Sequence, residues 1–155
     1  MDKYDHKYEV SYGGAGSGKS VFTAQKLIIK ALRYQRNVLI VRKTLVSQYK
    51  SCWKLIIKTL SDFQLLDYCK VRKSNYEIEL PNGSIFYFIG LDDAERIKSI
   101  VDIGDVWCEE ATEITAEDFD QLVIRARAAV PFRQIFVTFN PTSRANWVFK
   151  RWFAV

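Results

Sequence analysis

The 155-residue sequence has a single histidine, His6, and three cysteines, none of which forms a C-x-x-C pair. We therefore expect neither a Cys/His zinc site nor a disulfide framework, and this cysteine usage favours a reducing compartment. No run of apolar residues approaches the ~20 that a transmembrane helix needs. The N-terminal stretch MDKYDHKYEV also lacks the apolar core of a secretory signal. The sequence therefore predicts no association with a membrane and no export.

Acidic residues are missing from one long segment, because none occurs between Glu9 and Asp62. Residues 1–74 contain 15 Lys and Arg against 5 Asp and Glu, whereas residues 75–155 contain 8 against 13. The net charge of +5 thus conceals a basic first half and an acidic second half. Such polarity suits a polyanionic partner. On charge alone, a solvated basic face without a partner is the alternative.

Internal repeats, low-complexity tracts and Pro- or Ser-rich linkers are also absent from the sequence. With 48% hydrophobic and 26% charged residues, the composition is that of a globular protein long enough to bury a core. We therefore expect a single domain over residues 1–155.

Hydrophobic periodicity predicts strands and helices that alternate along the chain. A hairpin is expected at residues 75–90, with Asn82-Gly83 as its turn. Strands are predicted at residues 8–12, 37–43, 105–110 and 134–140, and helices at 19–33, 46–60 and 115–128, the last beginning with a capping box from Thr115 to Asp118. This alternation predicts an α/β fold, with a mostly parallel central sheet flanked by helices and a β-hairpin insertion.

A glycine-rich loop follows the first predicted strand and matches G-x-x-x-x-G-K-[ST]. Its glycines allow backbone N–H groups to face phosphates, and the helix N-terminus adds partial positive charge. We expect Lys19 to reach the β- and γ-phosphates and Ser20 to ligate Mg²⁺. The alternative is a glycine-rich turn that matches by chance. The residues expected to bind the nucleotide are Gly13, Gly14, Ala15, Gly16, Ser17, Gly18, Lys19 and Ser20.

The strand predicted at residues 105–110 ends in two acids, Glu109 and Glu110. Mg²⁺ prefers hard oxygen ligands, and a water that attacks the γ-phosphate needs a base. We expect Glu109 to hold the metal and Glu110 to orient and deprotonate the water, with a solvated acidic turn as the alternative. A second acid favours hydrolysis over transfer to a small molecule. Because no N-K-x-D motif is present, ATP is favoured over GTP.

The last predicted strand also ends in a polar cluster, in which Thr138 and Asn140 precede Pro141. A third strand end beside the γ-phosphate can sense hydrolysis through hydrogen bonds. A plain strand-to-turn transition with Asn-Pro chemistry is the alternative.

Four segments in this order, GGAGSGKS, GLDDAERIKSI, DVWCEEATEI and VTFNPTS, resemble the ATPase domain of phage terminase large subunits. Proteins of that family pump double-stranded DNA into viral procapsids. The resemblance implies a RecA-like P-loop NTPase fold of the additional-strand glutamate type, with ATP and Mg²⁺ as ligands. It implies the phosphate and metal roles given above for Lys19, Ser20, Glu109 and Glu110. It also implies that Thr138 and Asn140 couple hydrolysis to movement.

Two features of the family are altered or missing in this sequence. An arginine common in the family's phosphate loop is replaced by Ala15. The segment that would supply a basic residue to a neighbouring subunit's ATP contains Arg96 and Lys98, of which arginine has the better geometry. A C-terminal nuclease domain and most of the family's upstream adenine-binding segment are absent. We therefore expect a fragment or split gene product without nuclease activity.

The resemblance further implies partners and a location. These are double-stranded DNA, a portal, a small terminase subunit, a homo-oligomeric ring, and the cytoplasm of an infected bacterial host. Lys50, Lys54 and Lys58 fall at i, i+4 and i+8 and form a candidate DNA-contacting row, since phosphates would relieve the repulsion between them. A second, similar row comprises Lys26, Lys30 and Arg33. Solvated helix faces are the alternative for both rows. For the function as a whole, the alternatives are another ATP-driven translocase or helicase, or a non-hydrolysing nucleotide-switched binding module.

Overall fold

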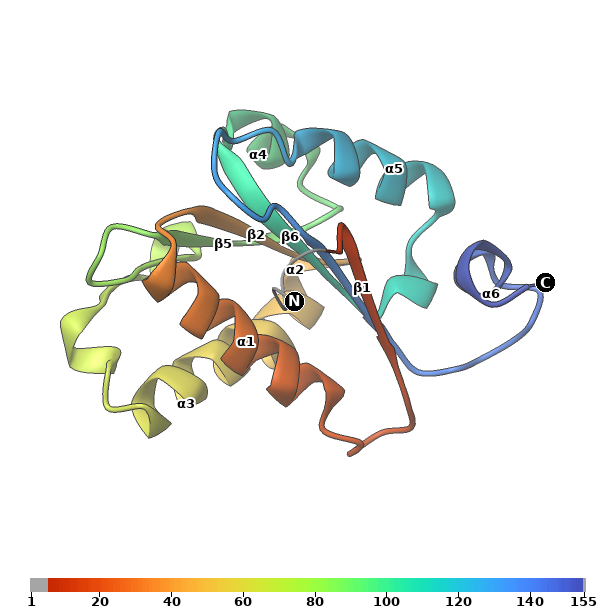
Figure 1. Ribbon diagram of the computed structural model, residues 1–155, viewed down its shortest axis with the longest axis horizontal. Helices are drawn as coiled ribbons and strands as arrows, with labels where there is room; N and C mark the ends of the chain where they lie inside the picture. The colour runs from red at the N-terminus through yellow and green to blue at the C-terminus, as the bar shows by residue number, and fades with distance from the viewer. Residues whose placement is uncertain (1–5, 155) are drawn as a thin grey trace.

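The computed structural model describes residues 6–154, so residues 1–5 and 155 of the predicted domain lie outside the description. Its centre is a seven-stranded sheet in the order β1-β7-β6-β2-β5-β4-β3 (Figure 1). The first five strands in this order are parallel to one another, whereas β4 is antiparallel to β5, and β3 is antiparallel to β4. The strands are β1 (Tyr8–Tyr12), β2 (Asn37–Arg42), β3 (Lys70–Arg72), β4 (Glu77–Glu79), β5 (Ile85–Gly90), β6 (Ile103–Glu109) and β7 (Ile135–Phe139). The predicted α/β fold is confirmed.

Helices cover both faces of this sheet (Figure 1). On one face lie α1 (Lys19–Arg33) and α3 (Lys54–Asp62), which is joined to β2 through α2 (Leu45–Gln48) and the π-helix η1 (Tyr49–Trp53). On the other face lie α4 (Ala94–Ser99), α5 (Ala116–Arg125) and α6 (Trp147–Trp152). Three 3₁₀ turns complete the description: η2 (Leu66–Tyr68), η3 (Lys73–Asn75) and η4 (Ala111–Glu113).

Because side chains alternate along a strand, the central strands feed two separate cores. In β2, Val38 and Ile40 join the core under α1 and α3, whereas Leu39 and Val41 join the core under α4, α5 and α6. All four side chains are almost completely buried. This explains why β2 is an unbroken apolar run, as expected for a parallel strand covered on both faces.

The elements differ from the predicted ones where short pieces or breaks in periodicity occur. The helix predicted at 19–33 and the strand predicted at 8–12 have the expected bounds, and the 75–90 hairpin is formed by β4 and β5. The helix predicted at 46–60 is interrupted by η1, and α5 stops at Arg125 instead of residue 128. Of the capping box, the structure shows the Thr115 hydroxyl accepting from the Asp118 N–H. The sequence analysis missed β3, α4 and α6, which have three or six residues and are too short to show a period.

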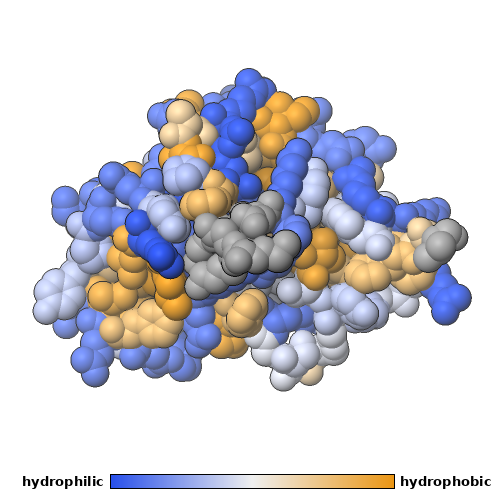
Figure 2. Space-filling model, viewed as in Figure 1, coloured by the Kyte–Doolittle hydropathy of each residue, from blue (hydrophilic) through white to orange (hydrophobic). Residues whose placement is uncertain are grey.

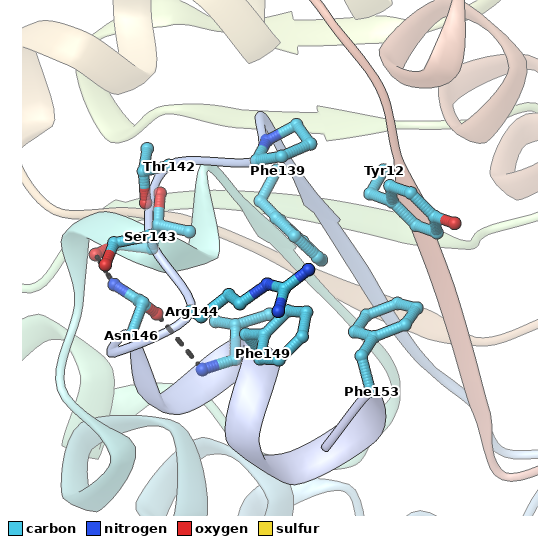
Figure 3. A pocket seen from close by; sticks show the side chains of 11 residues that line it. Tyr12, Phe139, Thr142, Ser143, Arg144, Asn146, Phe149 and Phe153 are labelled. Carbon is cyan, nitrogen blue, oxygen red and sulfur yellow. Dashed lines mark hydrogen bonds between the residues drawn. The ribbon is translucent and has the colours of Figure 1, made fainter. Parts of the chain in front are cut away.

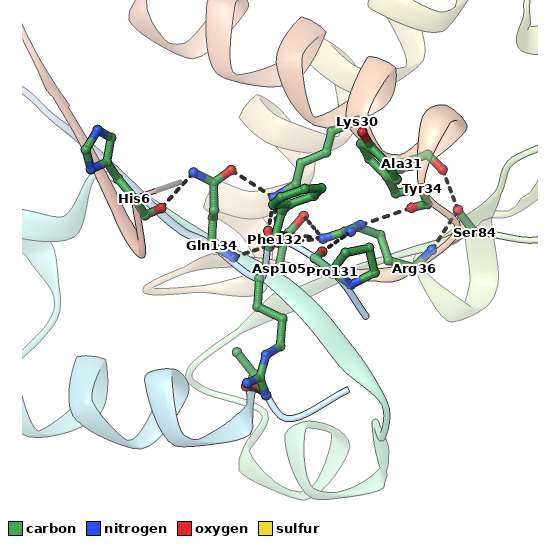
Figure 4. A network of polar contacts seen from close by, with 12 residues as sticks. His6, Lys30, Ala31, Tyr34, Arg36, Ser84, Asp105, Pro131, Phe132 and Gln134 are labelled. Carbon is green, nitrogen blue, oxygen red and sulfur yellow. Dashed lines mark hydrogen bonds and ion pairs between the residues drawn. The ribbon is translucent and has the colours of Figure 1, made fainter. Parts of the chain in front are cut away.

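A buried polar network connects α1 to the amino-terminal ends of β2, β6 and β7 (Figure 4). Asp105, fully buried in β6, receives hydrogen bonds from Lys30 (3.0 Å), Arg36 (3.2 Å) and the Gln134 N–H (2.8 Å). Burial lowers the pKa of Lys30 to about 8. The proposed basic row of Lys26, Lys30 and Arg33 is therefore wrong for Lys30, because its side chain points into the core to pair with Asp105. Lys26 pairs with Glu9.

The surface on the side drawn in Figure 2 is mainly hydrophilic, with hydrophobic residues scattered over the helices. On α1, the exposed hydrophobic side chains are Val21, Phe22 and Ile29. Between residues 6 and 154, none of the helices combines the length and the apolar character that crossing a bilayer requires.

Candidate nucleotide-binding site

The loop between β1 and α1 has a backbone that requires glycine at two positions. Gly16 and Gly18 have φ values of 77° and 83°, in the left-handed region that only glycine enters without strain. Gly18 is also the N-cap residue of α1, and no side chain caps the first turn. The Gly13 N–H donates to the carbonyl of Phe139 at 3.4 Å, which fastens the start of the loop to the end of β7.

This loop has the features of an anion-binding site. Open space surrounds the positions where side chains of Gly14, Gly16 and Gly18 would begin. The first turn of α1 contains no acidic residue, and the N-terminus of this 15-residue helix directs partial positive charge at the loop. Free N–H groups, a helix dipole and an adjacent lysine suit phosphate groups. The structure thus places the predicted nucleotide-binding residues in one exposed loop.

Lys19, the first residue of α1, reaches across to the end of β7. Its ammonium group donates a hydrogen bond to the Asn140 side-chain oxygen at 2.5 Å. These residues are 121 positions apart in the sequence. The structure therefore brings the predicted phosphate-binding lysine and the predicted coupling asparagine into direct contact.

Ser20, the next residue, begins a chain of hydrogen bonds that joins three elements. Its hydroxyl donates to the Glu109 carboxylate at 2.7 Å, and the Thr138 hydroxyl donates to the other oxygen of that carboxylate. Trp107 donates its indole N–H to the Thr138 hydroxyl at 2.8 Å. Glu109 and Thr138 are paired neighbours on β6 and β7, and both project to the α1 face. Sequence analysis had assigned no role to Trp107, which is fully buried.

Glu109 lies in an environment that disfavours its negative charge. Its exposed fraction is 7%, and burial raises the pKa of its carboxyl group, although the hydrogen bonds from Thr138 and Ser20 act in the opposite direction. The neighbouring Glu110 raises this pKa further, and Arg42 lowers it. A carboxylate in this state gains from a nearby cation, because the cation offsets the desolvation of its charge.

The donor set at this position fits Mg²⁺. Within residues 6–154, no group of three or more His, Cys, Asp or Glu side chains is placed to hold a metal by itself. Mg²⁺ usually keeps several waters and binds through one or two protein oxygens plus substrate phosphates. The hydroxyl of Ser20 and the carboxylate of Glu109, which are in contact beside the loop, supply two hard oxygens of this kind.

Glu110 follows β6 and has a strained backbone. Its φ and ψ are 52° and 53°, a left-handed conformation that is uncommon for a residue with a side chain. It is half-buried, and within the described residues its carboxylate has neither a hydrogen bond nor an ion pair. Strain of this kind persists where the surrounding structure enforces it, and it is concentrated at functional sites. No residue in the described structure thus competes with a ligand for this carboxylate.

Arg42 ends β2 at the same edge of the sheet and was not identified from the sequence. Its guanidinium donates to Ser51 at 3.0 Å and to Glu113 at 3.1 Å, whereas its buried Nε has no partner among the described residues. Its position at the carboxyl end of a buried strand was a usable signal, because ligands of parallel sheets bind at that edge.

Arg96 and Lys98, the residues expected to act on a neighbouring subunit, lie on α4. The Arg96 guanidinium donates to the carbonyls of Phe88 (2.8 Å), Tyr76 (3.1 Å) and Asn75, and burial lowers its pKa. Lys98 is exposed and lies 3.4 Å from Glu95. Because β7, β6 and β2 separate β1 from β5, α4 lies away from the phosphate loop of its own subunit. Arg96 is thus already engaged within the chain.

The row of Lys50, Lys54 and Lys58 is exposed on η1 and α3, as expected for a surface row. Lys58 is paired with Asp62 at 2.6 Å. Within the part of the chain that the structure describes, Lys50 and Lys54 have no such carboxylate partner.

A pocket of about 270 Å³ adjoins the loop on the α6 side of the sheet (Figure 3). Four of its eleven lining residues are aromatic. Tyr12 and Phe153 lie 4.8 Å apart between ring centroids, and the Arg144 guanidinium lies 5.8 Å from the Phe149 ring. Sequence analysis did not predict this pocket, because its lining comes from β1, η4, β7, α6 and the loop before α6. The lining residues are Tyr12, Thr112, Phe139, Pro141, Thr142, Ser143, Arg144, Asn146, Val148, Phe149 and Phe153.

The site combines a phosphate-binding loop on β1, an acidic end on β6 and a polar end on β7. Since β7 is inserted between β1 and β6, the fold and site define a P-loop NTPase of the additional-strand glutamate type. The chain belongs to the phage terminase large subunit family, whose model, described as "Phage terminase large subunit", matches residues 5–155.

Relatives and solved structures agree with this family. The chain is 29% identical over 150 residues to the PBSX phage terminase large subunit of Bacillus subtilis (strain 168), covering 97% of this chain and 35% of the relative. It is 28% identical over 156 residues to the terminase large subunit of Bacillus phage SPP1, covering 94% and 37%. The chain therefore spans little more than a third of each relative's length.

Among solved structures, the large terminase of a thermophilic bacteriophage superimposes with a TM-score of 0.80 at 16% identity, covering 95% of this chain and 37% of that one. The same phage protein in complex with ADP gives a TM-score of 0.79 at 15% identity, with 97% and 38% covered. This similarity shows the fold, and the family itself is shown by the family model.

Proposed function

We propose that this chain hydrolyses ATP in a Mg²⁺-dependent reaction that powers translocation of double-stranded DNA into viral procapsids. The observation that carries the proposal is the convergence of three strand ends, in which Lys19 contacts Asn140, and Ser20 and Thr138 both contact Glu109. The residues predicted to bind phosphate, to hold the metal and to couple hydrolysis to movement thus contact one another. The activity of the whole enzyme remains a proposal, because the chain spans about a third of its relatives.

In this proposal residues 13–20 surround the phosphates. Apart from the N–H groups of Gly13 and Ser17, which donate to Phe139 and Gly14, their backbone N–H groups bind the phosphates together with the α1 dipole. Lys19 exchanges its bond with the Asn140 oxygen for the β- and γ-phosphate oxygens. Ser20 and Glu109 hold Mg²⁺, which when bound neutralises charge that develops on the phosphates. Glu110, whose carboxylate has no competing partner in the described structure, orients the attacking water and accepts its proton.

Thr138 and Asn140 carry the signal from nucleotide to movement in this proposal. When Lys19 turns to the phosphates, Asn140 loses its 2.5 Å bond and the end of β7 is released from α1. Thr138 remains bound to Glu109 and so senses the metal site. In this proposal Asn140 therefore couples β7 to the phosphate-binding lysine, and Thr138 couples it to the metal-binding glutamate.

Family membership supports a homo-oligomeric ring in function, acting with a portal and a small terminase subunit in the cytoplasm of an infected bacterial host. The polarised basic charge supports a DNA partner. As one domain, residues 1–155 carry the ATPase part, and we expect no nuclease activity from them. Arg96 or Lys98 remains the proposed residue acting in trans, with Lys98 the more accessible of the two.

The test is steady-state ATP hydrolysis with Mg²⁺, with and without double-stranded DNA, beside the variant Glu110→Gln. We expect the variant to bind ATP while its turnover falls by roughly 10²- to 10⁴-fold, the usual contribution of a general base. Stimulation of the wild type by duplex DNA supports translocation of DNA. A matched control, Glu113→Gln, removes a nearby carboxylate that binds Arg42 and should retain turnover.

Other outcomes lead to the alternative functions. If the wild type binds ATP but neither it nor Glu110→Gln turns it over, the chain is at most a nucleotide-switched binding module. If single-stranded nucleic acid stimulates turnover and duplex DNA does not, another translocase or a helicase is supported.

A further inference from the structure

Two lysines from separate elements converge on one aromatic ring, away from the nucleotide site. The ammonium group of Lys54, on α3, lies 5.7 Å from the Tyr49 ring centroid, and that of Lys73, on η3, lies 5.4 Å from it. Tyr49 belongs to η1 and packs against Trp53 and Tyr76 with centroid separations of 6.5 and 6.3 Å. Its packing against Trp53 and Tyr76 therefore fixes the Tyr49 ring, and both lysine ammonium groups lie beside that ring.

These lysines have no acidic partner in the described structure, unlike three other exposed lysines, although Lys7, Lys43 and Lys150 are also exposed without one. Lys50, Lys54 and Lys73 are exposed, and within the described structure none has a carboxylate within 4.0 Å. The exposed lysines that do have such a partner are Lys58 with Asp62 (2.6 Å), Lys70 with Glu79 (3.9 Å) and Lys98 with Glu95 (3.4 Å). Converging like charges repel each other, and cation–π contacts offset only part of this. An external polyanion would neutralise them.

From this arrangement we propose that the Tyr49 surface, defined as Tyr49, Lys50, Lys54 and Lys73, contacts the sugar–phosphate backbone of double-stranded DNA. The proposal rests on the proposed function and names the surface that engages its substrate. It changes the row expected from the sequence, because Lys58 is paired with Asp62 and Lys73 from η3 takes its place.

The chemistry of the surface favours phosphate contacts over base recognition. Lysine ammonium groups act as point charges and lack the planar fork with which arginine reads base edges. Tyr49 is half-buried between Trp53 and Tyr76, so its ring is not an open stacking platform for unpaired bases. Binding through phosphates alone is independent of sequence.

The Tyr49 surface is also tied to the edge of the sheet where the nucleotide site lies. Ser51, within η1, accepts a hydrogen bond from Arg42 at the end of β2 at 3.0 Å. Gln48, fully buried just before η1, donates to the carbonyls of Ile40 (2.8 Å) and Ile89 (3.0 Å). Single-turn π-helices are frequent at functional sites. The segment that carries Tyr49 and Lys50 is thus hydrogen-bonded to β2 and β5.

The test compares two triple variants with the same loss of positive charge. The first is Lys50→Gln, Lys54→Gln, Lys73→Gln, and the matched control is Lys58→Gln, Lys70→Gln, Lys98→Gln. Affinity for duplex DNA of random sequence is measured over a range of salt concentrations, without ATP. Each lost phosphate contact should lower the slope of log K against log salt by about 0.9. We expect the first variant to lose about 2 to 3 units of slope and on the order of 10²-fold in affinity, and the control to lose much less.

ATP binding and melting temperature, measured on the same variants, should match the wild type, because all six lysines are exposed. Equal loss of DNA affinity in both triple variants would show dependence on net charge only and would overturn the proposed surface. Wild-type affinity in the first variant would overturn it as well, while leaving the ATPase and translocation proposal intact. A wild type that hydrolyses ATP but does not bind duplex DNA at low salt would remove the DNA partner itself.

Discussion

Single residues at the site show how the fold balances stability against function. Glu109 is buried with its charge, and two hydroxyl donors compensate only part of the desolvation. Its pKa is therefore raised above the ordinary glutamate value of about 4.3. Between the pKa of the unfolded state and the higher pKa of the folded state, this carboxyl group is protonated only in the folded protein. The free energy of unfolding therefore falls as the pH rises through this interval. The same burial makes the carboxylate a better partner for a metal.

Glu109→Gln should therefore be at least as stable as the wild type at pH 7, because it removes a buried charge and keeps an oxygen to accept the Ser20 hydroxyl. The gain should shrink towards pH 4, where the wild-type carboxyl is protonated. Mg²⁺-dependent nucleotide binding should fall at the same time. Thermal melting across this pH range and nucleotide titrations with and without Mg²⁺ measure both effects. If the variant melts at a lower temperature than the wild type at pH 7 and at the same temperature at pH 4, the buried charge of Glu109 does not destabilise the fold.

At the residue scale, the sequence identified candidate side chains for the site but not the contacts between them. The loop motif identified Lys19 and Ser20, and the strand-end acids and amide identified Glu109 and Asn140. The contact between Lys19 and Asn140 depends on β7 lying beside β1, which no local pattern reveals. Arg42 and Trp107 were missed for the same reason, since their relevance comes from neighbours in space.

At the scale of elements, the short helix α4 is held by Ile97 and Ile100 in the core, by a hydrogen bond from Arg125 to the Ile97 carbonyl, and by Arg96. The Arg96 guanidinium reaches from α4 to carbonyls of β5 and of the segment before β4, and it lies 5.5 Å from the Tyr76 ring. A six-residue helix gains little stability from its own hydrogen bonds. Arg96 therefore adds to the core contacts that dock α4.

Arg96→Ala should lower the free energy of unfolding by about 2 kcal/mol, because three carbonyls lose a charged donor. Lys98→Ala, an exposed neighbour on the same helix, should change it by less than about 0.5 kcal/mol. Urea denaturation of both variants measures the difference. If Arg96→Ala leaves stability unchanged, its contacts within the chain are weak and its guanidinium is available to a neighbouring subunit's nucleotide.

Elements were predictable where they were long or regularly patterned. The 15 residues of α1 repeat their apolar positions over several turns, and its bounds were correct. The three residues of β3 and the six of α4 are too short to show a period, and they form through contacts with β4 and β5. The π-helix η1 was not foreseeable, because it adds a residue per turn without changing the local composition.

At the scale of the whole molecule, one buried carboxylate joins α1, β2 and β6 at the edge of the sheet opposite the nucleotide site (Figure 4). Asp105 has no exposed surface, and its negative charge pairs with the positive charges of both Lys30 and Arg36. This network fixes the helix that carries the phosphate loop relative to the strand that carries Glu109. Removing one partner of such a group leaves uncompensated buried charge.

Asp105→Asn should lower the free energy of unfolding by about 3–5 kcal/mol, because Lys30 and Arg36 remain buried without a carboxylate. The control Asp120→Asn breaks the exposed pair with Arg151 and should cost less than about 1 kcal/mol. Chemical denaturation of the two variants gives both values. Equal and small losses would mean that the network contributes little to the docking of α1.

The sequence by itself determined the alternation of strands and helices, the glycine-rich loop and the residue types at the carboxyl edge of the sheet, because these depend on local periodicity and on motifs within a few residues. Only the tertiary structure decided which strand ends meet, how Asp105 compensates Lys30 and Arg36, and which lysines converge on Tyr49. Strand order is set by how two apolar faces are buried between helices from distant parts of the chain. Those contacts cannot be predicted from any single segment of the sequence.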